Sequence, residues 1–597
     1  MRTNLYDLWL RRPEYGSTIR VDRELADALP LIQRTRSIAW RALTDLSRTP
    51  QRSRRGRADS QRRCKRDVNL VQQRNRGRYP AVVLAAPTAV TAPPGPSLER
   101  LLPSRVQRFV SWSCIIVMVT VVTRVPLASR YLFSWDSASF ALALDDYNVA
   151  AHQPHPPGYP LYVAAAWVLR PLFADANAAY VGLSIVASAC AATLLLGLGW
   201  RLMGERAALL AVVLWLTSPN AWGHGLVAYP YAFLSLFSAA VAWTTIETRW
   251  GRHNLSIAGA LLLGVGSGFR PDLLLLIGPL WLFGVWQRGI RTIGIGLVVV
   301  TASVAAWFVP MLAHSGGWPG YFAASEIYAN YWGTPHGSVG QFVLGMRSNF
   351  DELTSYVVQS TGPTFALLLM YAIGRVLAPP VLRVRPRLGI LFVWMIPAVA
   401  FYSIVHIGNL GYLLSILPAL CILGAASIEA AASDVAGVLG NRVSARWLAV
   451  GLGTVAASVS SIMFLGVAGP VTLHEIRDVD REFTGALPIV RTYPVDSTLV
   501  LAFDRYRQYD YYLPRYRRAD HLVAAIDLRQ DRLGRATFQV PAGISTIVLP
   551  DLYANSAETP GRVERVTGTD GAVIFVAHVQ PGDQLRIGPG YARTVAH

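Results

Sequence analysis

Long apolar stretches separated by short polar ones recur over most of this chain. A helix needs about 20 mostly apolar residues to cross a bilayer, and eleven stretches come near that length. They cover residues 109–127, 178–200, 207–222, 226–246, 254–269, 271–286, 292–313, 363–379, 389–405, 411–432 and 447–468. We therefore expect a mainly α, polytopic membrane protein with about eleven transmembrane helices.

A shorter apolar segment, 160–173, decides how these spans are oriented. If it does not cross the membrane, the arginine clusters after the second, fourth, sixth, eighth and tenth apolar stretches all lie on the same side as the N-terminus. This agrees with the positive-inside rule. These clusters contain Arg201, Arg206, Arg249, Arg252, Arg288, Arg291, Arg383, Arg385, Arg387, Arg442 and Arg446. We predict a cytoplasmic N-terminus, an extracytoplasmic C-terminus, and a segment 160–173 that packs at or dips into the interface.

The composition is that of a membrane protein, and residues 1–108 differ from the rest by their high positive charge. Hydrophobic residues make up 52% of the chain and charged residues 15%, which is far from the usual balance of a soluble protein. Residues 1–108 hold 23 Lys and Arg against 9 Asp and Glu, so +14 of the net charge of +19 lies there. We expect 1–108 to be an Arg-rich, disordered cytoplasmic region. Its run RSRRGR could bind nucleic acid or anionic lipid, but a positive-inside flank is the interpretation that we prefer, with no nucleic acid as a partner.

The four cysteines give no sign of an extracytoplasmic disulfide. Cys64 lies in the Arg-rich region, whereas Cys114, Cys190 and Cys421 lie in apolar segments. We expect small core residues there.

Two soluble parts complete the domain organisation. The transmembrane domain is expected to cover 109–469, including a long outer loop at 314–362, and an extracytoplasmic domain is expected at 470–597. The latter contains the β-type runs TLVLAF, STIVLP and AVIFVAHV, separated by polar turns, which predicts a small α/β or α+β domain. Its stretch YDYYLPRYRR could contact an acidic or sugar partner, although packing of the tyrosines in a core is the simpler interpretation.

The first outer loop, residues 131–162, concentrates more polar chemistry than any other loop of its length. Ser134 or Asp136 can cap a helix whose apolar face contains Phe140, Ala143, Leu144 and Tyr147. The following run HQPHPPGYP cannot be helical, because its prolines remove donors and restrict the preceding residues. We expect a fixed strap that turns His152 and His155 toward Asp136.

This loop also resembles a known family. The order of an apolar span, WDS, an amphipathic helix and HQPHPPGYPLY is similar to the first extracytoplasmic loop of C-superfamily glycosyltransferases. The resemblance is greatest to the family 39-like branch, which includes protein mannosyltransferases and aminoarabinose transferases of lipid A. The stretches GSGFRPDLLLLIGPLW and PAVAFYSIVHIGNLGYLLSILPAL resemble later segments of the same proteins, so that the likeness covers about residues 109–470.

The resemblance implies an enzyme that transfers a sugar from a polyprenyl phosphate to a hydroxyl group. Such a reaction needs a carboxylate to take the acceptor proton and cations to hold the phosphate. Asp136 matches the family's loop carboxylate and is our candidate catalytic base; a simple helix cap is the alternative. Arg270 is our leading phosphate ligand, with snorkelling to the headgroups or a local pair with Asp272 as alternatives. Three histidines could add donors to the phosphate, although a lone histidine is more often structural: His152, His155 and His406.

Further residues are candidates for substrate binding. Asp145 and Asp146 would lie about 14–15 Å beyond Asp136 on a continuous helix. Aromatic rings can contact sugar faces or anchor loops at the headgroup level, and this applies to Tyr159, Trp318 and Tyr321. The sequence shows no acidic pair or Cys/His pattern for a metal, and the family generally works without a cofactor, so we expect no metal and leave a divalent ion open.

The chain also departs from the family. Where many relatives carry a Lys before the two prolines of the strap, this chain has HQPH, and where relatives often carry a Glu, it has His224. Phosphate contact could therefore fall to histidine and depend on pH.

The function that we predict is glycosyl transfer at the outer face of the plasma or inner membrane, with inversion. The partners would be a polyprenyl-phosphate sugar donor, membrane lipid, and a glycan, lipid or protein acceptor. A transporter or flippase is the alternative, although the hydropathy shows no inverted repeat and the polar residues gather in outer loops. A structural or assembly subunit is a third reading, and it would not depend on Asp136.

Overall fold

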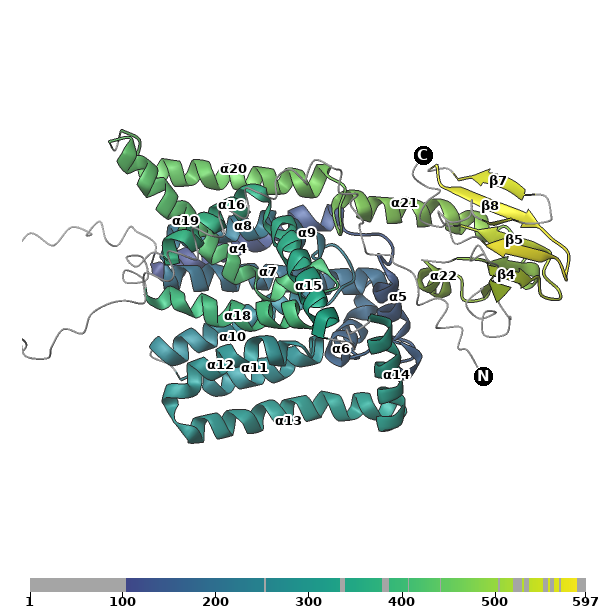
Figure 1. The fold of residues 1–597 in the computed structure, drawn as a ribbon, viewed down its shortest axis with the longest axis horizontal. Coiled ribbons are helices and arrows are strands. Elements are labelled where there is room, and N and C mark those ends of the chain that lie inside the picture. Colours follow the sequence, from purple (N-terminus) through teal and green to yellow (C-terminus); the bar gives the residue numbers. More distant parts are fainter. Residues whose placement is uncertain are drawn as a thin grey trace, which may run out of the picture. The chain divides into compact units, whose positions relative to one another are not determined.

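The structure is a computed structural model. It describes the following residues (Figure 1): 104–251, 254–332, 339–377, 386–405, 407–440, 442–502, 505–518, 529–530, 536–550, 557–558, 563–568 and 571–587. The predictions for residues 1–103, including Cys64, lie outside them.

Each of the eleven apolar stretches contains a helix. These helices are α4 (Arg105–Arg124), α7 (Ala176–Leu202), α8 (Glu205–Thr217), α10 (Tyr231–Trp250), α11 (Ser256–Phe269), α12 (Leu273–Val285), α13 (Ile290–His314), α16 (Pro363–Leu377), α18 (Gly389–Ile404), α19 (Leu417–Val438) and α20 (Ala445–Gly466). Short 3-10 helices follow or precede some of them: η3 (Val125–Leu127), η6 (Trp286–Arg288), η7 (Pro386–Leu388) and η8 (Leu410–Ser415). Stretch 207–222 is broken at Ser218, which caps the separate helix α9 (Pro219–Gly223).

The described helices include several that suit a bilayer. Five are long and apolar enough to cross one by length and composition, namely α4 with η3, α7, α13, α19 and α20. A sixth span would be the pair Gly345–Thr361 and Pro363–Gly374, which is bent by 114°. The other predicted spans are shorter or less apolar. The chain is thus an integral membrane protein with several spans, while the full count of eleven and the orientation stay predictions.

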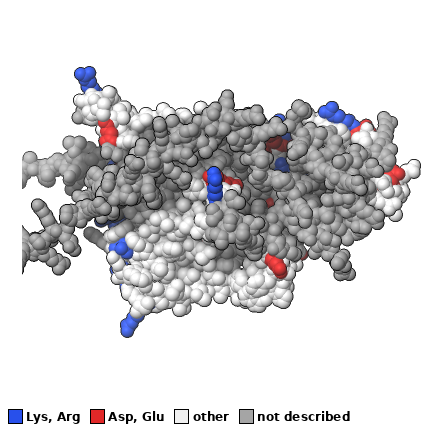
Figure 2. Space-filling view, viewed as in Figure 1, with Lys and Arg blue, Asp and Glu red and all other residues white. Residues whose placement is uncertain are grey.

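The outer surface of the helix bundle is apolar, as contact with lipid requires. In the face shown in Figure 2, the described surface is largely free of charged residues. Helix α13 is an example, because Ile290 and Val298 are 80% and 69% exposed. Helix α7 instead lies in the core and packs against α4, α8 and α10. Gly199 allows one of these contacts, since a Cβ there would come within 2.8 Å of the Ala208 backbone.

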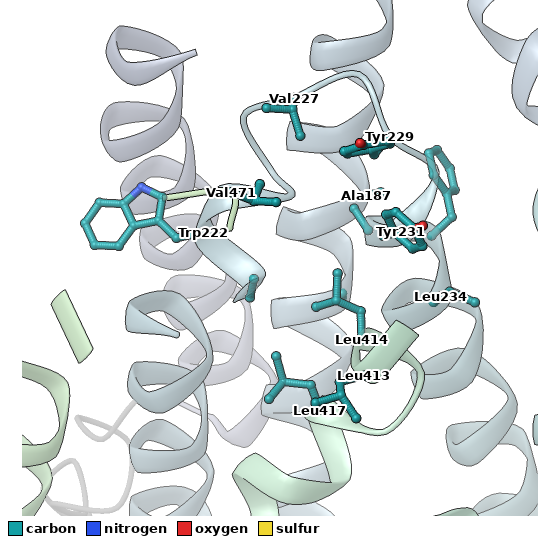
Figure 3. Close-up of a cluster of buried hydrophobic side chains, with 14 of the residues drawn as sticks. Ala187, Trp222, Val227, Tyr229, Tyr231, Leu234, Leu413, Leu414, Leu417 and Val471 are labelled. Carbon is teal, nitrogen blue, oxygen red and sulfur yellow. The ribbon is translucent and has the colours of Figure 1, made fainter. Parts of the chain in front are cut away.

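The core reaches from the bundle to its first loop. Figure 3 shows aromatic and aliphatic side chains of α7, α9, α10 and the η8–α19 segment packed together. Gly411 lets η8 approach α10 closely, because a Cβ there would lie 2.4 Å from the ring of Tyr231. This packing sets the position of Tyr412, the next residue of η8.

The first loop has a short helix followed by a strap. Helix α5 (Trp135–Leu142) ends before Ala143, so the predicted longer apolar face does not form. The strap contains η4 (Val149–Ala151) and two cis peptide bonds, Gln153–Pro154 and Pro156–Pro157. Segment 160–173 forms α6 (Pro160–Leu169) and η5 (Arg170–Leu172). With ten residues, or about 15 Å, α6 is too short to cross a bilayer.

Segment 314–362, predicted as a long loop, contains two helices. They are α14 (Gly317–Trp332) and α15 (Val339–Thr361). Helix α15 packs against α9, α16, α18 and η8, so this segment forms part of the helical bundle.

The C-terminal domain combines helices and strands, as predicted, and the strands form two sheets. Its helices are α21 (Leu473–Val490), η9 (Val495–Ser497) and α22 (Tyr506–Tyr512). The first sheet has the order β2-β1-β5-β8-β7, formed by Arg517–Arg518, Thr498–Val500, Thr546–Leu549, Val573–His578 and Val563–Thr567. The second has the order β3-β4-β9-β6, formed by Arg529–Gln530, Ala536–Gln539, Gln584–Ile587 and Ala557–Glu558. Strand β1 runs parallel to β2 and β5, and the other pairs are antiparallel, which is an α+β arrangement.

Candidate active site

Asp136 lies in the first turn of α5 but does not cap it. The cap is Ser134, whose hydroxyl accepts a hydrogen bond from the backbone N–H of Ser137 at 3.2 Å. The Asp136 side chain is 31% exposed and lies near the positive end of the helix dipole, which favours a negative charge. The carboxylate is therefore not needed for capping and can act elsewhere.

The strap brings His155 to this carboxylate. Nδ1 of His155 lies 3.5 Å from Oδ1 of Asp136, and the imidazole is almost fully buried between Trp135 and Phe140. Burial lowers the pKa of His155, which Asp136 partly opposes and the charge of Arg270 reinforces. His155 is consequently a neutral imidazole at neutral pH, able to orient a carboxylate without neutralising its charge.

Arg270 ends α11 and lies in a buried cluster of charge and aromatic rings. Its Nε is 3.1 and 3.2 Å from the two oxygens of Asp272, so the local pair considered in the sequence does form. Only 6% of the residue is exposed, which excludes snorkelling. The guanidinium carbon lies 4.5 Å from the ring centre of Tyr231 and 4.4 Å from that of Tyr412, within the range of cation–π attraction.

Tyr159 connects the two halves of this site. Its hydroxyl is 3.2 Å from Nε2 of His155, and its ring centre is 5.8 Å from the guanidinium carbon of Arg270. The contacts thus form one path from Asp136 through His155 and Tyr159 to Arg270. The backbone before Tyr159 is fixed by Gly158, which has a φ of +106° and no room for a side chain beside Met311.

His152 lies in the same strap but faces the C-terminal domain. It has a φ of 55°, and its ring lies 6.3 Å from that of Trp135. Burial lowers the pKa of His152 from 6.5 to about 4, and the charge of Arg507 adds to this effect. No contact joins His152 to Arg270 within the described part of the chain, so a shared role at the phosphate gains no direct support from the geometry.

Helix α22 of the C-terminal domain completes the wall around α5. The indole N–H of Trp135 donates a hydrogen bond to the hydroxyl of Tyr506 at 2.8 Å. Arg507 lies over the same indole at 5.6 Å and donates to the carbonyl of Ala151 at 3.1 Å. The run YDYYLPRYRR overlaps this helix, and its Tyr509 is buried, which agrees with packing of the tyrosines in a core. The sequence did not indicate that the helix contacts the first loop.

The other predicted residues lie at different places. Asp145 and Asp146 are exposed in the turn after α5, and Asp145 lines a separate cavity. Trp318 is 54% exposed and stacks on Phe322 of its own helix, whereas Tyr321 packs near the strap with Phe308. His406 lies outside the described residues.

His224 lies close to Arg270 and the tyrosines around it. Its ring lies 5.0 Å from that of Tyr231, and the side chain is fully buried. Burial lowers the pKa of His224 to about 4, so it adds a neutral group instead of a second carboxylate. The carboxylate that contacts Arg270 is that of Asp272, two residues further along the chain.

The described residues include free cysteines but no cluster of side chains that could hold a metal ion. In the part of the chain that the structure describes, no three His, Cys, Asp or Glu residues gather into a metal-binding group. Cys114, Cys190 and Cys421 are free cysteines. Cys421 is buried, as expected of a small core residue, whereas Cys114 and Cys190 are exposed on their helices, so the expectation was wrong for these two.

The architecture as a whole is that of a mainly helical polytopic membrane protein with a small sheet-containing C-terminal domain. It is similar to ArnT from Cupriavidus metallidurans bound to undecaprenyl phosphate, with a TM-score of 0.50 and 16% identity over 80% of this chain and 99% of that chain. The apo state of that ArnT gives a TM-score of 0.46 with 15% identity over the same shares of the two chains. The Archaeoglobus fulgidus oligosaccharyltransferase tethered with an acceptor peptide gives 0.40 with 13% identity, over 69% of this chain and 63% of that one.

The sequence matches no protein-family model. It also matches no curated protein sequence. The similarity to ArnT is therefore one of fold.

Proposed function

We propose that the protein is a membrane glycosyltransferase that moves a sugar from a polyprenyl-phosphate donor to a hydroxyl group on the outer face of the membrane. The observation that carries the proposal is the contact path between Asp136 and Arg270. The path joins a carboxylate to a guanidinium, and the reaction needs a carboxylate and a cation.

The carboxylate of Asp136 takes the proton of the acceptor hydroxyl as its oxygen attacks the anomeric carbon. The bond from that carbon to the phosphate oxygen breaks, and the electron pair leaves with the polyprenyl phosphate. A single displacement of this kind inverts the anomeric configuration. Nδ1 of His155 lies 3.5 Å from the carboxylate and holds it in place. Because the imidazole is neutral, its burial costs little free energy.

Arg270 binds the leaving phosphate in this scheme. Its pair with Asp272 uses Nε, and the planar guanidinium is stacked among tyrosine rings that restrict its rotation. A guanidinium held in this way can form the bidentate contact that suits phosphate oxygens. Asp272 lowers the cost of keeping the cation buried while the donor is absent.

The identity of the donor is supported by the comparison of folds. The ArnT structure that is similar to this chain holds undecaprenyl phosphate. A polyprenyl phosphate is also the donor class that the sequence of the first loop implies. The acceptor would be an envelope glycan, lipid or protein.

The test uses a strain that lacks the gene. The envelope glycans and lipids of this strain are compared with those of the parent to find the sugar that is missing. The strain is then complemented with the wild-type gene or with a variant, and the return of that sugar is measured. We expect the wild-type gene to restore it and Asp136→Asn to fail, because loss of a general base lowers turnover about 10²- to 10⁴-fold. The polyprenyl-phosphate sugar should accumulate in the Asp136→Asn strain.

Asp146→Asn is the matched control, since it removes an exposed carboxylate of the same loop. It should restore the sugar as the wild type does. Full restoration by Asp136→Asn at normal protein levels would contradict the proposal and favour a structural subunit. A deletion strain whose sugars are complete but unevenly distributed across the membrane would favour a transporter or flippase.

A further inference from the structure

A cavity of about 530 Å³ lies beside the C-terminal end of α5, at the opposite end of that helix from Asp136. Its polar and aromatic lining comes from three separate segments. Asp145 follows α5, Trp167 and Arg170 belong to α6 and η5, and Tyr511 comes from α22 of the C-terminal domain. The proposed transfer reaction does not use any of these side chains.

The two aromatic residues of this cavity, Tyr511 and Trp167, differ in how closely the rest of the chain packs around them. The hydroxyl of Tyr511 hydrogen-bonds to the backbone of Ala176, and its ring packs edge-on against Tyr512 at 5.1 Å. Burial raises the pKa of Tyr511, so the phenol stays neutral. Trp167 is 65% exposed, so the rest of the chain leaves much of its indole uncovered. Such rings offer flat apolar surfaces next to polar groups, which is the character of a sugar face.

The charged groups of the lining balance one another. Asp145 supplies a carboxylate that can only accept hydrogen bonds, and Arg170 supplies a guanidinium that can only donate them. Arg170 is held in place, because Nη1 donates to the carbonyl of Phe173 at 3.0 Å. A ligand with several hydroxyl groups and no net charge satisfies both groups, whereas an anion or a cation would be repelled by one of them.

The position of the cavity restricts which sugar it could hold. Helix α5 has eight residues, so its two ends lie about 12 Å apart. A sugar in the cavity would therefore be too far from Asp136 to donate its own hydroxyl. The next units of the same glycan chain can reach that carboxylate.

We propose that this cavity binds a neutral sugar residue of an extended glycan acceptor, a unit or more away from the hydroxyl that Asp136 deprotonates. This inference rests on the proposed function and assigns the acceptor class to a glycan instead of a single lipid or peptide group. It also gives the C-terminal domain a role, since Tyr511 forms part of the site.

Binding can be tested separately from transfer. The detergent-purified full chain is applied to an array of neutral hexose and pentose saccharides, from monosaccharides to hexasaccharides. We expect retention of at least one oligosaccharide and none of the monosaccharides. Trp167→Ala and Asp145→Asn should each weaken that retention about tenfold or more, because each removes a direct contact.

Two carboxylate variants serve as controls. Asp146→Asn removes the neighbouring carboxylate, which does not line the cavity, and should bind as the wild type does. Asp136→Asn should also keep its affinity while failing to restore the missing sugar in the deletion strain. Loss of complementation with binding intact separates this proposal from the proposed function.

The inference is overturned if the wild-type protein retains no oligosaccharide, or if Trp167→Ala and Asp145→Asn bind as well as it does. Vesicles of phosphatidylethanolamine provide the last arm, because that headgroup also carries one positive and one negative charge. Competition by these vesicles that disappears in Asp145→Asn would assign the cavity to a lipid headgroup and likewise overturn the glycan assignment.

Discussion

The buried Arg270 forms an ion pair with the half-buried Asp272 at the turn between α11 and α12, with Nε of the arginine 3.1 and 3.2 Å from the carboxylate oxygens. The tyrosines that surround the guanidinium come from the strap, from α10 and from η8. A cation this deeply buried is costly unless it is paired, and the pair explains why the arginine is tolerated when no donor is bound.

Arg270→Ala should remove about 3 kcal/mol of transition-state stabilisation. This corresponds to a decrease of kcat/KM for the donor of more than about a hundredfold. Arg270→Lys keeps the charge but loses the planar fork, so partial activity is expected. The measurement is sugar transfer in reconstituted membranes, with the amount of folded protein checked by thermal unfolding.

The pair itself requires a control, because Arg270→Ala leaves Asp272 with an uncompensated charge. The double variant Arg270→Ala/Asp272→Ala should regain much of the stability lost in the single variant and none of the activity. Recovery of activity in the double variant would show that Arg270 matters only as a partner of Asp272.

The pKa of His152 predicts a dependence of stability on pH. It falls from 6.5 to about 4 in the folded protein, so above pH 6.5 the group is neutral in both states and its contribution is constant. Between about pH 6.5 and 4 only the unfolded chain binds the proton, and the free energy of unfolding falls as the pH falls. After allowance for solvent screening the loss is about 1 kcal/mol.

This dependence can be measured by thermal unfolding in detergent between pH 7.5 and 4.5. His152→Asn should make the curve less steep, while the part due to His155 and His224, whose pKa values burial also lowers, remains. Asparagine tolerates the left-handed backbone at this position. His314→Gln, at an exposed histidine, is the control and should leave the slope unchanged. An equal slope in the wild type and His152→Asn would assign the effect to other groups.

Asp480 should be a major stabilising contact between α21 and the first loop. Its carboxylate accepts hydrogen bonds from the backbone N–H groups of Arg130 and Tyr131 at 2.8 and 3.2 Å, and Arg477 pairs with it at 2.7 Å. Asp480→Ala should lower the free energy of unfolding by about 1–3 kcal/mol, because it leaves two part-buried backbone donors and the Arg477 guanidinium without their acceptor. Limited proteolysis at the start of the C-terminal domain should accelerate in parallel.

Asp478→Ala on the same helix provides the comparison. Its side chain is 41% exposed, so the ion pairs it makes should contribute about 1 kcal/mol or less. Equal effects of the two variants would mean that α21 is not held through Asp480.

The orientation in the membrane can be tested with reporter fusions. Fusions after residues 204 and 385 should report the cytoplasm, and fusions after residues 335 and 480 the exterior, because the arginine clusters then all lie inside. A cytoplasmic signal from the fusion after residue 480 would contradict the topology and place the candidate site on the wrong side for an external acceptor.

Much of the helical architecture could be predicted because its signals are local. The length of an apolar run, the prolines of the strap and the serine before α5 act over a few residues, and helices form at all eleven apolar stretches. The three β-type runs likewise became β1, β5 and β8. The lengths of α5 and of the helices within 314–362 were missed, since Leu142 ends α5 although the apolar pattern continues, and packing against η8 and α18 stabilises α15.

The candidate site divides in the same way. The sequence by itself determined that Asp136, His155 and Arg270 are available, because each stands in a recognisable local context at the end of an apolar helix or within the strap. Only the tertiary structure decided that Tyr231 and Tyr412 surround Arg270 and that Tyr506 and Arg507 contact Trp135. Those partners lie far apart in the chain, and their meeting depends on how the helices pack, which local patterns of polarity do not encode.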